Sequence, residues 1–327
     1  MRGASEVVVT QVGLTTALGD DPGALLAALD GGLSALRPSA VLAHLPDPRA
    51  GVVAGPDLKA WLKRRKDAKL LPRSAELVLA AAGRALSGWT GDRGELGLFL
   101  GVGREPPDDG ESEACLLASA EDGRLSDARL AGPGRDLYPP LLPLKTLPNM
   151  ALAHVSINLG LMGENASWAG GLGAGALALY AGCTAVAEGR CPAALVGGAD
   201  SLVDLGNARD RLRMGELDPP GEAAALLLIE RADLARARGA RVLGVLEALD
   251  GPDAVAHPGA TADLRAALGC TGAAEGPLAV VRDLWRAASA GFQGAGLGGG
   301  RRVWAGADDG LPPVGVALRA PERPVDA

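Results

Sequence analysis

Apolar and polar positions along the chain predict strands and helices in alternation. Short runs rich in apolar residues predict strands at residues 7–9, 96–100, 166–169, 193–196, 223–230, 242–249 and 314–318. Apolar residues at helical spacing predict helices at residues 22–33, 58–86, 111–120, 148–159, 174–188, near 234 and at 277–288. Asp21 precedes the first helix as a competent N-cap. Strands and helices that alternate throughout a chain indicate the α/β class.

The composition indicates a core of small side chains. The 327 residues are 48% hydrophobic but only 3% aromatic, and 48 of them are glycine. The core must therefore be built from alanine, valine and leucine on backbones that approach closely. The net charge of -7 and the isoelectric point near 5.1 argue against general nucleic-acid binding, which needs a basic face.

The cysteines and one uncharged segment bear on three questions: whether the protein binds a metal, which redox compartment it occupies and whether it spans a membrane. Four cysteines form no CxxC pair, and no histidine is spaced to complete a zinc site. We therefore expect no metal, no cofactor and a reducing, cytoplasmic setting. Residues 165–187 carry no charge, but their Gly, Asn, Ser and Thr favour a buried strand, a turn and a core helix over a membrane span.

Five motifs follow one another in the order and spacing of a known family. The central ones are GENASWAGGLGAG at residues 163–175 and ALVGGAD at 194–200. Supporting matches lie at residues 7–19, at Asn149-Met150, and at 221–230 with 238–240. Together they resemble the β-ketoacyl-ACP synthases. The resemblance implies a thiolase-like, layered αβαβα fold, with a ketosynthase-like half at residues 1–236 and an abbreviated C-terminal half at 237–327, packed as one globular unit.

Active members of this family place a nucleophilic cysteine on a sharp turn between a strand and a helix. Leu172 occupies that position here, between Gly171 and Gly173. Leucine has no lone pair and cannot be acylated. The resemblance therefore implies that the chain has the glycines of the family's nucleophile turn but lacks the cysteine sulfur.

The family also uses two histidines, with a lysine shortly before the second, to assist decarboxylation. His257 at best mimics the first histidine motif. Aligning the second motif on Gly269 and Gly276 places Cys270 at its histidine and Arg265 at its lysine. The resemblance therefore implies that the whole proton relay is missing, so the chain is expected to be a non-catalytic subunit.

A basic run stands out against the acidic whole. It contains the residues Lys63, Arg64, Arg65, Lys66 and Lys69. Such a run is usually a solvated helix face, but it can also steer an acidic partner. The resemblance places it, together with Arg209, where ketosynthases meet acyl carrier protein.

The resemblance also points to positions at a tunnel or subunit interface. Gly110, Glu113 and Leu117 match the segment that limits the acyl pocket in chain length factors. Ser167 and Trp168 lie on the strand that such dimers pair across a two-fold axis. Leu172 is expected in the same interface or tunnel.

A family member without its nucleophile resembles the chain length factor, or ketosynthase β subunit, of type II polyketide synthases. Its expected partners are an active ketosynthase and acyl carrier protein, with no nucleic acid or membrane. Many such subunits carry glutamine at the position of Leu172, so leucine and the shortened C-terminal half favour a divergent subgroup, such as that of polyene-building systems. Two alternatives remain open: a malonyl-ACP decarboxylase or acyltransferase that uses Cys270 or another group, and a thiolase-fold scaffold.

Overall fold

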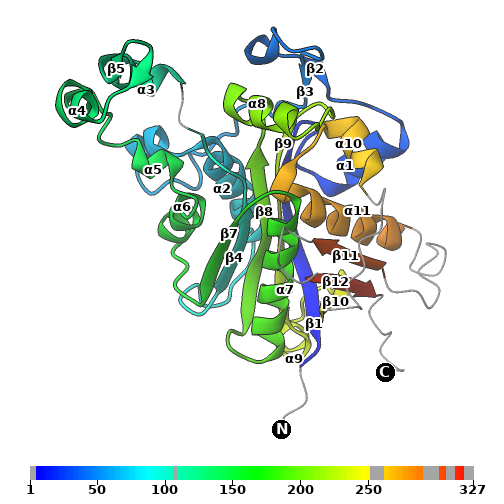
Figure 1. Cartoon of the computed structure of the whole chain (residues 1–327). Helices are drawn as coiled ribbons and strands as arrows, with labels where there is room; N and C mark the ends of the chain where they lie inside the picture. Colours follow the sequence, from blue (N-terminus) through cyan, green and yellow to red (C-terminus); the bar gives the residue numbers. More distant parts are fainter. Residues whose placement is uncertain (1–4, 107–108, 251–260, 290–301, 307–313, 320–327) are drawn as a thin grey trace.

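The computed structural model describes residues 5–106, 109–250, 261–289, 302–306 and 314–319. Its centre is one mixed sheet in the order β11-β12-β10-β1-β9-β8-β4-β7 (Figure 1). The strands are β1 Val7–Thr16, β4 Gly97–Val102, β7 Asn165–Ala169, β8 Ala193–Ser201, β9 Glu222–Arg231, β10 Gly244–Asp250, β11 Arg302–Gly306 and β12 Val314–Arg319. Strands β7, β4 and β8 are parallel, and the other neighbours are antiparallel.

The sheet curls around one central helix. Helix α7 (Leu172–Ala187) packs against β4 and β8 and also against β10, β11 and β12. Helix α11 (Glu275–Ser289) lies beside it on the same face, and α2 (Arg73–Ala85) and α6 (Met150–Leu159) cover the other face (Figure 1). This arrangement confirms the predicted layered α/β fold, with its β layers formed by two arms of one curled sheet.

Strand β9 shows why the sheet is buried on both faces. Ala223, Ala225, Leu227 and Ile229 belong to the core around α7 and α11, whereas the residues between them belong to the core under α2 and α6. Because side chains alternate across a strand, a strand covered on both faces must be apolar at every position. The unbroken apolar run at residues 223–229 is therefore explained by the burial of β9 on both faces.

Several predicted elements change their bounds. Strand β1 continues to Thr16, since its second half pairs with β9 from Gln11 onward. The long helix predicted at residues 58–86 is divided: η2 (Arg65–Leu70) is a short 3₁₀ helix, and α2 begins only after Pro72. Proline disfavours the α conformation of the residue before it, which explains the break. Strand β7 is half-exposed, not buried as predicted, because it is the edge strand.

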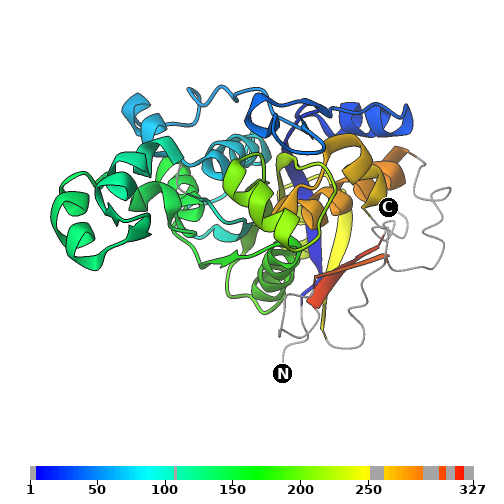
Figure 2. The same cartoon turned by 45° about the horizontal axis from the view of Figure 1, so that its top comes forward.

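The remaining elements lie at the periphery. A lobe projects beside α6 and consists of α3 (Asp109–Ala118), β5 (Ala120–Glu121), β6 (Arg124–Leu125), α4 (Asp127–Arg129), the π-helix η3 (Leu130–Gly134) and α5 (Pro143–Thr146) (Figures 1 and 2). The upper end of the sheet in Figure 1 carries α1 (Pro22–Asp30), β2 (Arg37–Pro38), η1 (Ala40–Leu42), β3 (Arg49–Ala50), α8 (Leu205–Arg213), α10 (Ala262–Leu268) and η5 (Gly272–Ala274). Helix α9 (Ala232–Ala237) links β9 to β10. As predicted, Asp21 caps α1, its carboxylate accepting the Ala24 N–H at 2.7 Å.

Among the described residues, no helix is both long and apolar enough to cross a membrane. The uncharged segment forms β7, a turn and α7. All four cysteines are free and buried.

The contact between β1 and α2 leaves no room for a side chain at Gly13. A Cβ on Gly13 would lie 1.9 Å from the Ala81 carbonyl oxygen and 2.7 Å from the Ala85 nitrogen. We expect Gly13→Ala to lower the free energy of unfolding by about 1–3 kcal/mol, because α2 must move off the sheet. Urea unfolding followed by tryptophan fluorescence measures this, with Gly55→Ala as control, since a Cβ there meets nothing within 4 Å. Equal midpoints for the two variants would contradict the close contact.

Candidate functional site

The turn between β7 and α7 is the position at which the family resemblance places its nucleophile. The Gly170 N–H donates to the Val102 carbonyl at 3.0 Å, and Gly171 is the N-cap residue of α7. Leu172 is the first residue of the helix. The structure thus confirms a sharp strand-to-helix turn, whose helix N-terminus would lower the pKa of a cysteine placed there.

Glycines let three backbones meet behind this turn. A Cβ on Gly101 of β4 would lie 2.3 Å from the Gly175 nitrogen. A Cβ on Gly175 would lie 2.1 Å from the Ala273 carbonyl oxygen. The first turn of α7 is therefore held between β4 and the segment that follows Cys270.

Cys270 is not placed as a reactive thiol. It is 5% exposed, and burial raises the pKa of its thiol. Its N–H donates to the Pro219 carbonyl at 2.8 Å, and its carbonyl accepts the Gly221 N–H at 2.7 Å. Burial also raises the pKa of the Cys183 thiol to about 12. Since the thiolate is the nucleophile, both sulfurs have the surroundings of structural cysteines.

Arg265, which the family resemblance aligns with a lysine, forms two ion pairs. Its Nε lies 2.7 Å from Oε1 of Glu275, and its Nη1 lies 2.9 Å from Oδ2 of Asp218. These contacts tie α10 to α11 and to the loop before β9. His257 lies outside the described residues.

Asp200 is the most perturbed carboxyl group near the turn. It ends the GGAD segment of β8, is 2% exposed, and accepts the Ala273 N–H at 3.1 Å. Burial raises the pKa of Asp200 to about 7, the Ala273 N–H opposes this shift, and the charges of Glu105 and Asp204 add to it. Asp200 is therefore a buried carboxylic acid with a raised pKa, and the sequence analysis assigned it no role.

A polar network lies on the opposite face of the sheet, at the start of α2. Arg73 holds Glu222, with its Nη2 2.6 Å from Oε1, and the Ser201 hydroxyl donates to Oε2 at 2.9 Å. Glu105, just beyond β4, accepts the Ser74 N–H at 3.0 Å. Burial raises the pKa of Glu105, the hydrogen bonds from Ser74 oppose this shift, and the charges of Asp204 and Glu222 add to it.

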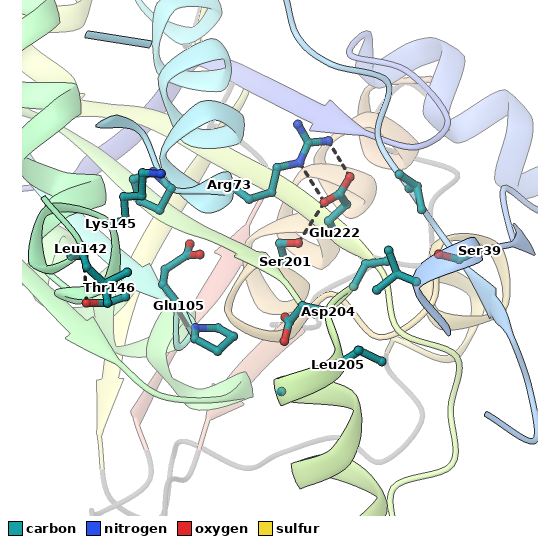
Figure 3. Close-up of a pocket in the computed structure, with 16 residues that line it drawn as sticks. Ser39, Arg73, Glu105, Leu142, Lys145, Thr146, Ser201, Asp204, Leu205 and Glu222 are labelled. Atoms are coloured by element: carbon teal, nitrogen blue, oxygen red, sulfur yellow. Dashed lines mark hydrogen bonds and ion pairs between the residues drawn. The ribbon is translucent and has the colours of Figure 1, made fainter. Parts of the chain in front are cut away.

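A cavity of about 660 Å³ is lined by the side chains of Arg73, Glu105, Ser201 and Glu222, among others (Figure 3). Its walls come from the β2–β3 hairpin, the start of α2, the segment after β4, α5 and the start of α8. A second hollow of about 590 Å³ lies along α8, and Leu205 and Gly206 line both. Neither cavity was predicted. The only sequence signal was that Glu222, which lines the larger cavity, occurs within a family motif.

The basic run is exposed but is not an α-helix. Lys63, Arg64, Arg65, Lys66 and Lys69 all lie on the surface in or before η2. The Lys63 N–H donates to Oδ1 of Asn158 on α6 at 3.0 Å, which anchors the segment. Arg209 lies on a different element, α8, where it lines the second hollow and pairs with Asp210 at 3.6 Å.

The predicted tunnel and interface residues lie on two surfaces. Gly110, Glu113 and Leu117 are on α3 in the lobe, with Leu117 68% exposed. These three residues are not among those that line the two cavities in the described part of the chain. Ser167 and Trp168 lie on the edge strand β7, where Trp168 also packs against the core around α7. Within the described residues, no group of three or more His, Cys, Asp or Glu side chains is placed to hold a metal ion.

The fold and the turn before α7 define a thiolase-type α/β protein. Residues 4–232 match the family model described as the N-terminal domain of β-ketoacyl synthases, so the chain belongs to the β-ketoacyl synthase family. A comparison with curated proteins finds no match.

Solved structures share the fold at low sequence identity. The ishigamide ketosynthase/chain length factor matches with TM-score 0.72 and 18% identity, over 98% of this chain and 100% of the other. AntDE:AntF, a type II polyketide synthase acyl carrier protein in complex with its ketosynthase bound to the hexaketide, matches with TM-score 0.71 and 14% identity, over 97% and 99%. A β-ketoacyl synthase from Burkholderia phymatum STM815 matches with TM-score 0.69 and 16% identity, over 97% and 100%.

The buried Asp200 makes stability depend on pH. Because its pKa rises from 3.8 to about 7, the folded chain retains a proton that the unfolded chain releases. The stabilising contribution of the group is therefore complete below pH 3.8 and is lost as the pH rises to about 7.

We expect Asp200→Asn, which keeps an oxygen acceptor for the Ala273 N–H, to gain stability relative to wild type by about 2–4 kcal/mol between pH 5 and pH 8. Urea unfolding of both proteins at each pH measures the difference. A difference that does not change with pH would contradict the raised pKa.

Proposed function

We propose that this chain is a catalytically inactive, chain length factor-like subunit that pairs with an active ketosynthase in polyketide synthesis. The observation that carries the proposal is a nucleophile turn without a nucleophile: Leu172 begins α7 directly after the N-cap Gly171. The buried thiol of Cys270 and the ion-paired Arg265 support it, because neither group is placed to rebuild the missing relay. A ketosynthase fold without a nucleophile or proton relay can still act as the second subunit of a dimer whose partner supplies these catalytic groups.

The edge strand β7 supports a subunit interface. The Leu98 N–H donates to the Glu164 carbonyl, and the Gly170 N–H donates to the Val102 carbonyl. In a parallel ladder these bonds direct the backbone groups of even-numbered residues toward β4. The N–H and C=O groups of Asn165, Ser167 and Ala169 therefore face outward, where a strand from a partner can pair with them.

Apolar side chains exposed near this edge support the same surface. The lobe and α6 lie on the β7 side of the molecule (Figures 1 and 2). Each of the following is at least 44% exposed: Leu116, Leu117, Leu125, Leu130, Leu137, Tyr138, Leu141, Leu147 and Ile157. Monomeric proteins rarely expose so many large apolar residues in one region, so a partner surface is expected to cover them.

The kinds of partner follow from the comparisons. One similar structure is a ketosynthase/chain length factor, and another is an acyl carrier protein with its ketosynthase. They support an active ketosynthase and an acyl carrier protein as partners of this chain. Its task is then to complete the dimer, shape the acyl tunnel and help recruit the carrier protein.

Co-expression with a candidate active ketosynthase tests the proposal. We expect the two chains to co-purify as a heterodimer that extends malonyl units, and each chain alone to make no product. Elution of this chain as a separate homodimer contradicts the proposal. So does release of carbon dioxide or formation of an acylated peptide when it is incubated alone with malonyl-carrier protein.

A substitution at the outward edge of β7 tests the interface. We expect Ser167→Pro to reduce heterodimer formation at least about tenfold, because proline removes an outward N–H that does not bond to β4. Ser167→Ala keeps that N–H and serves as the matched control. Analytical size-exclusion chromatography over a concentration series measures both. Equal dimerisation of the two variants, with unchanged thermal unfolding, would exclude pairing through this edge.

The basic segment is tested by charge reversal within the heterodimer. We expect the triple variant Arg65→Glu, Lys66→Glu and Lys69→Glu to weaken carrier-protein binding roughly tenfold at low salt and less at high salt. The control carries the same charge change at exposed arginines elsewhere, as Arg37→Glu, Arg236→Glu and Arg241→Glu. Fluorescence anisotropy of labelled carrier protein measures both. Equal weakening by the two variants would show an effect of total charge and no local docking site.

A further inference from the structure

The 660 Å³ cavity beside α2 lies apart from the turn before α7 and has no role in the function proposed above. It opens on the face of the sheet covered by α2, whereas α7 packs on the other face. Cavities of roughly 300–1,000 Å³ are of the size that small organic ligands occupy in proteins. The volume and the side chains of this cavity therefore define a candidate ligand site.

The charged side chains of the wall have a negative excess. Glu105, Asp204 and Glu222 supply carboxylates, and Arg73 and Lys145 supply cations. Arg73 is already engaged, because its guanidinium bonds to Glu222, to Glu76 and to the Val53 carbonyl. Glu222 is therefore neutralised within the wall, which leaves Glu105 and Asp204 as the carboxylates with no ion pair among the described residues.

The two remaining carboxylates differ in their hydrogen bonds. Both oxygens of Asp204 accept bonds from Asn207, so this side chain caps α8. Glu105 accepts the Ser74 N–H with Oε1, and the groups of the described residues that hydrogen-bond to its carboxylate, the N–H and the hydroxyl of Ser74, are both uncharged. Figure 3 shows its carboxylate pointing into the cavity, between Lys145 and Ser201. Among the described residues, Glu105 thus has no ion pair and, unlike Asp204, does not cap a helix.

The rest of the wall is apolar. Valines, leucines and prolines, among them Val52, Leu142 and Val203, line the same cavity as Glu105. A carboxylate that is partly removed from water and lies near other carboxylates is stabilised by a cation that enters with it. An apolar body attached to that cation would bury against the valines and leucines.

We propose that this cavity binds a small organic cation, with an ammonium group at Glu105 and an apolar body against Val52, Leu142 and Val203. The hydroxyl oxygen of Ser201, which donates to Glu222, retains lone pairs that accept a second ammonium hydrogen. The net charge of the wall disfavours an organic anion of the same shape. The proposal does not depend on the partner subunit and is tested on the full chain.

Three probes of equal length separate charge from shape: hexylammonium, hexanol and hexanoate, each titrated into the full chain by isothermal calorimetry. We expect hexylammonium to bind at least about tenfold more tightly than hexanol, and hexanoate to bind more weakly than hexanol. Affinity for hexylammonium should rise with pH as Glu105 becomes ionised. Equal binding of hexanoate, or no binding of hexylammonium at millimolar concentration, would overturn the proposal.

Two variants assign the site. Glu105→Gln keeps an acceptor for the Ser74 N–H but removes the charge, and we expect it to weaken hexylammonium binding at least about tenfold and to abolish the pH dependence. Glu121→Gln, on an exposed residue of the lobe, is the matched control. Val52→Trp adds bulk at a residue that is 49% exposed and should block the cavity with no change in charge. Wild-type affinity in both Glu105→Gln and Val52→Trp would overturn the assignment.

Discussion

The approach of α7 to the backbones around it is the constraint on which the rest of the molecule depends. A Cβ on Gly101 of β4 would lie 2.3 Å from the Gly175 nitrogen of α7, and a Cβ on Gly175 would lie 2.1 Å from the Ala273 carbonyl oxygen. Only at such distances can the sheet curl around the helix and reach it with β10, β11 and β12 as well as with β4 and β8. The scarcity of aromatic residues follows, because large rings would separate these layers.

The same packing gives the buried acids their properties. Removal of water around the ends of β4 and β8 raises the pKa of Asp200 on one face of the sheet and of Glu105 on the other. The carboxyl groups with raised pKa values therefore lie on β8 and just beyond β4, and not in the turn before α7. Of the two, Glu105 lines the cavity beside α2.

The surfaces that we propose for partner binding lie at the edge of the sheet, where strand β7 ends it. Strand β7 has no neighbour beyond it in the described sheet, and the lobe next to it exposes leucines that no described element covers. Because the central helix is enclosed, the exposed edge and the lobe are the surfaces at which we propose that a partner binds. The basic segment at η2 is held by α6, so the position of this surface is coupled to the helix beside the lobe.

The sequence by itself determined the class of fold, most strands and helices, and the leucine at the position where the family resemblance expects a nucleophile. These properties are local: the continuous apolar run of β9, the N-cap at Asp21 and the identity of residue 172 can each be read from neighbouring positions. Pro72 also carried a local signal, since it ends the helix predicted across it.

Only the tertiary structure decided which groups meet across long sequence separations. The ion pair of Arg73 with Glu222, the contact of Asp200 with Ala273, and the position of Glu105 on a cavity wall depend on how α2, β8 and β9 pack. A pKa depends on burial and on charges brought near in space, and a cavity depends on the shapes of several packed elements. Neither has a signature in a single stretch of sequence, which is why Leu172 could be identified from the chain alone and the polar cavity could not.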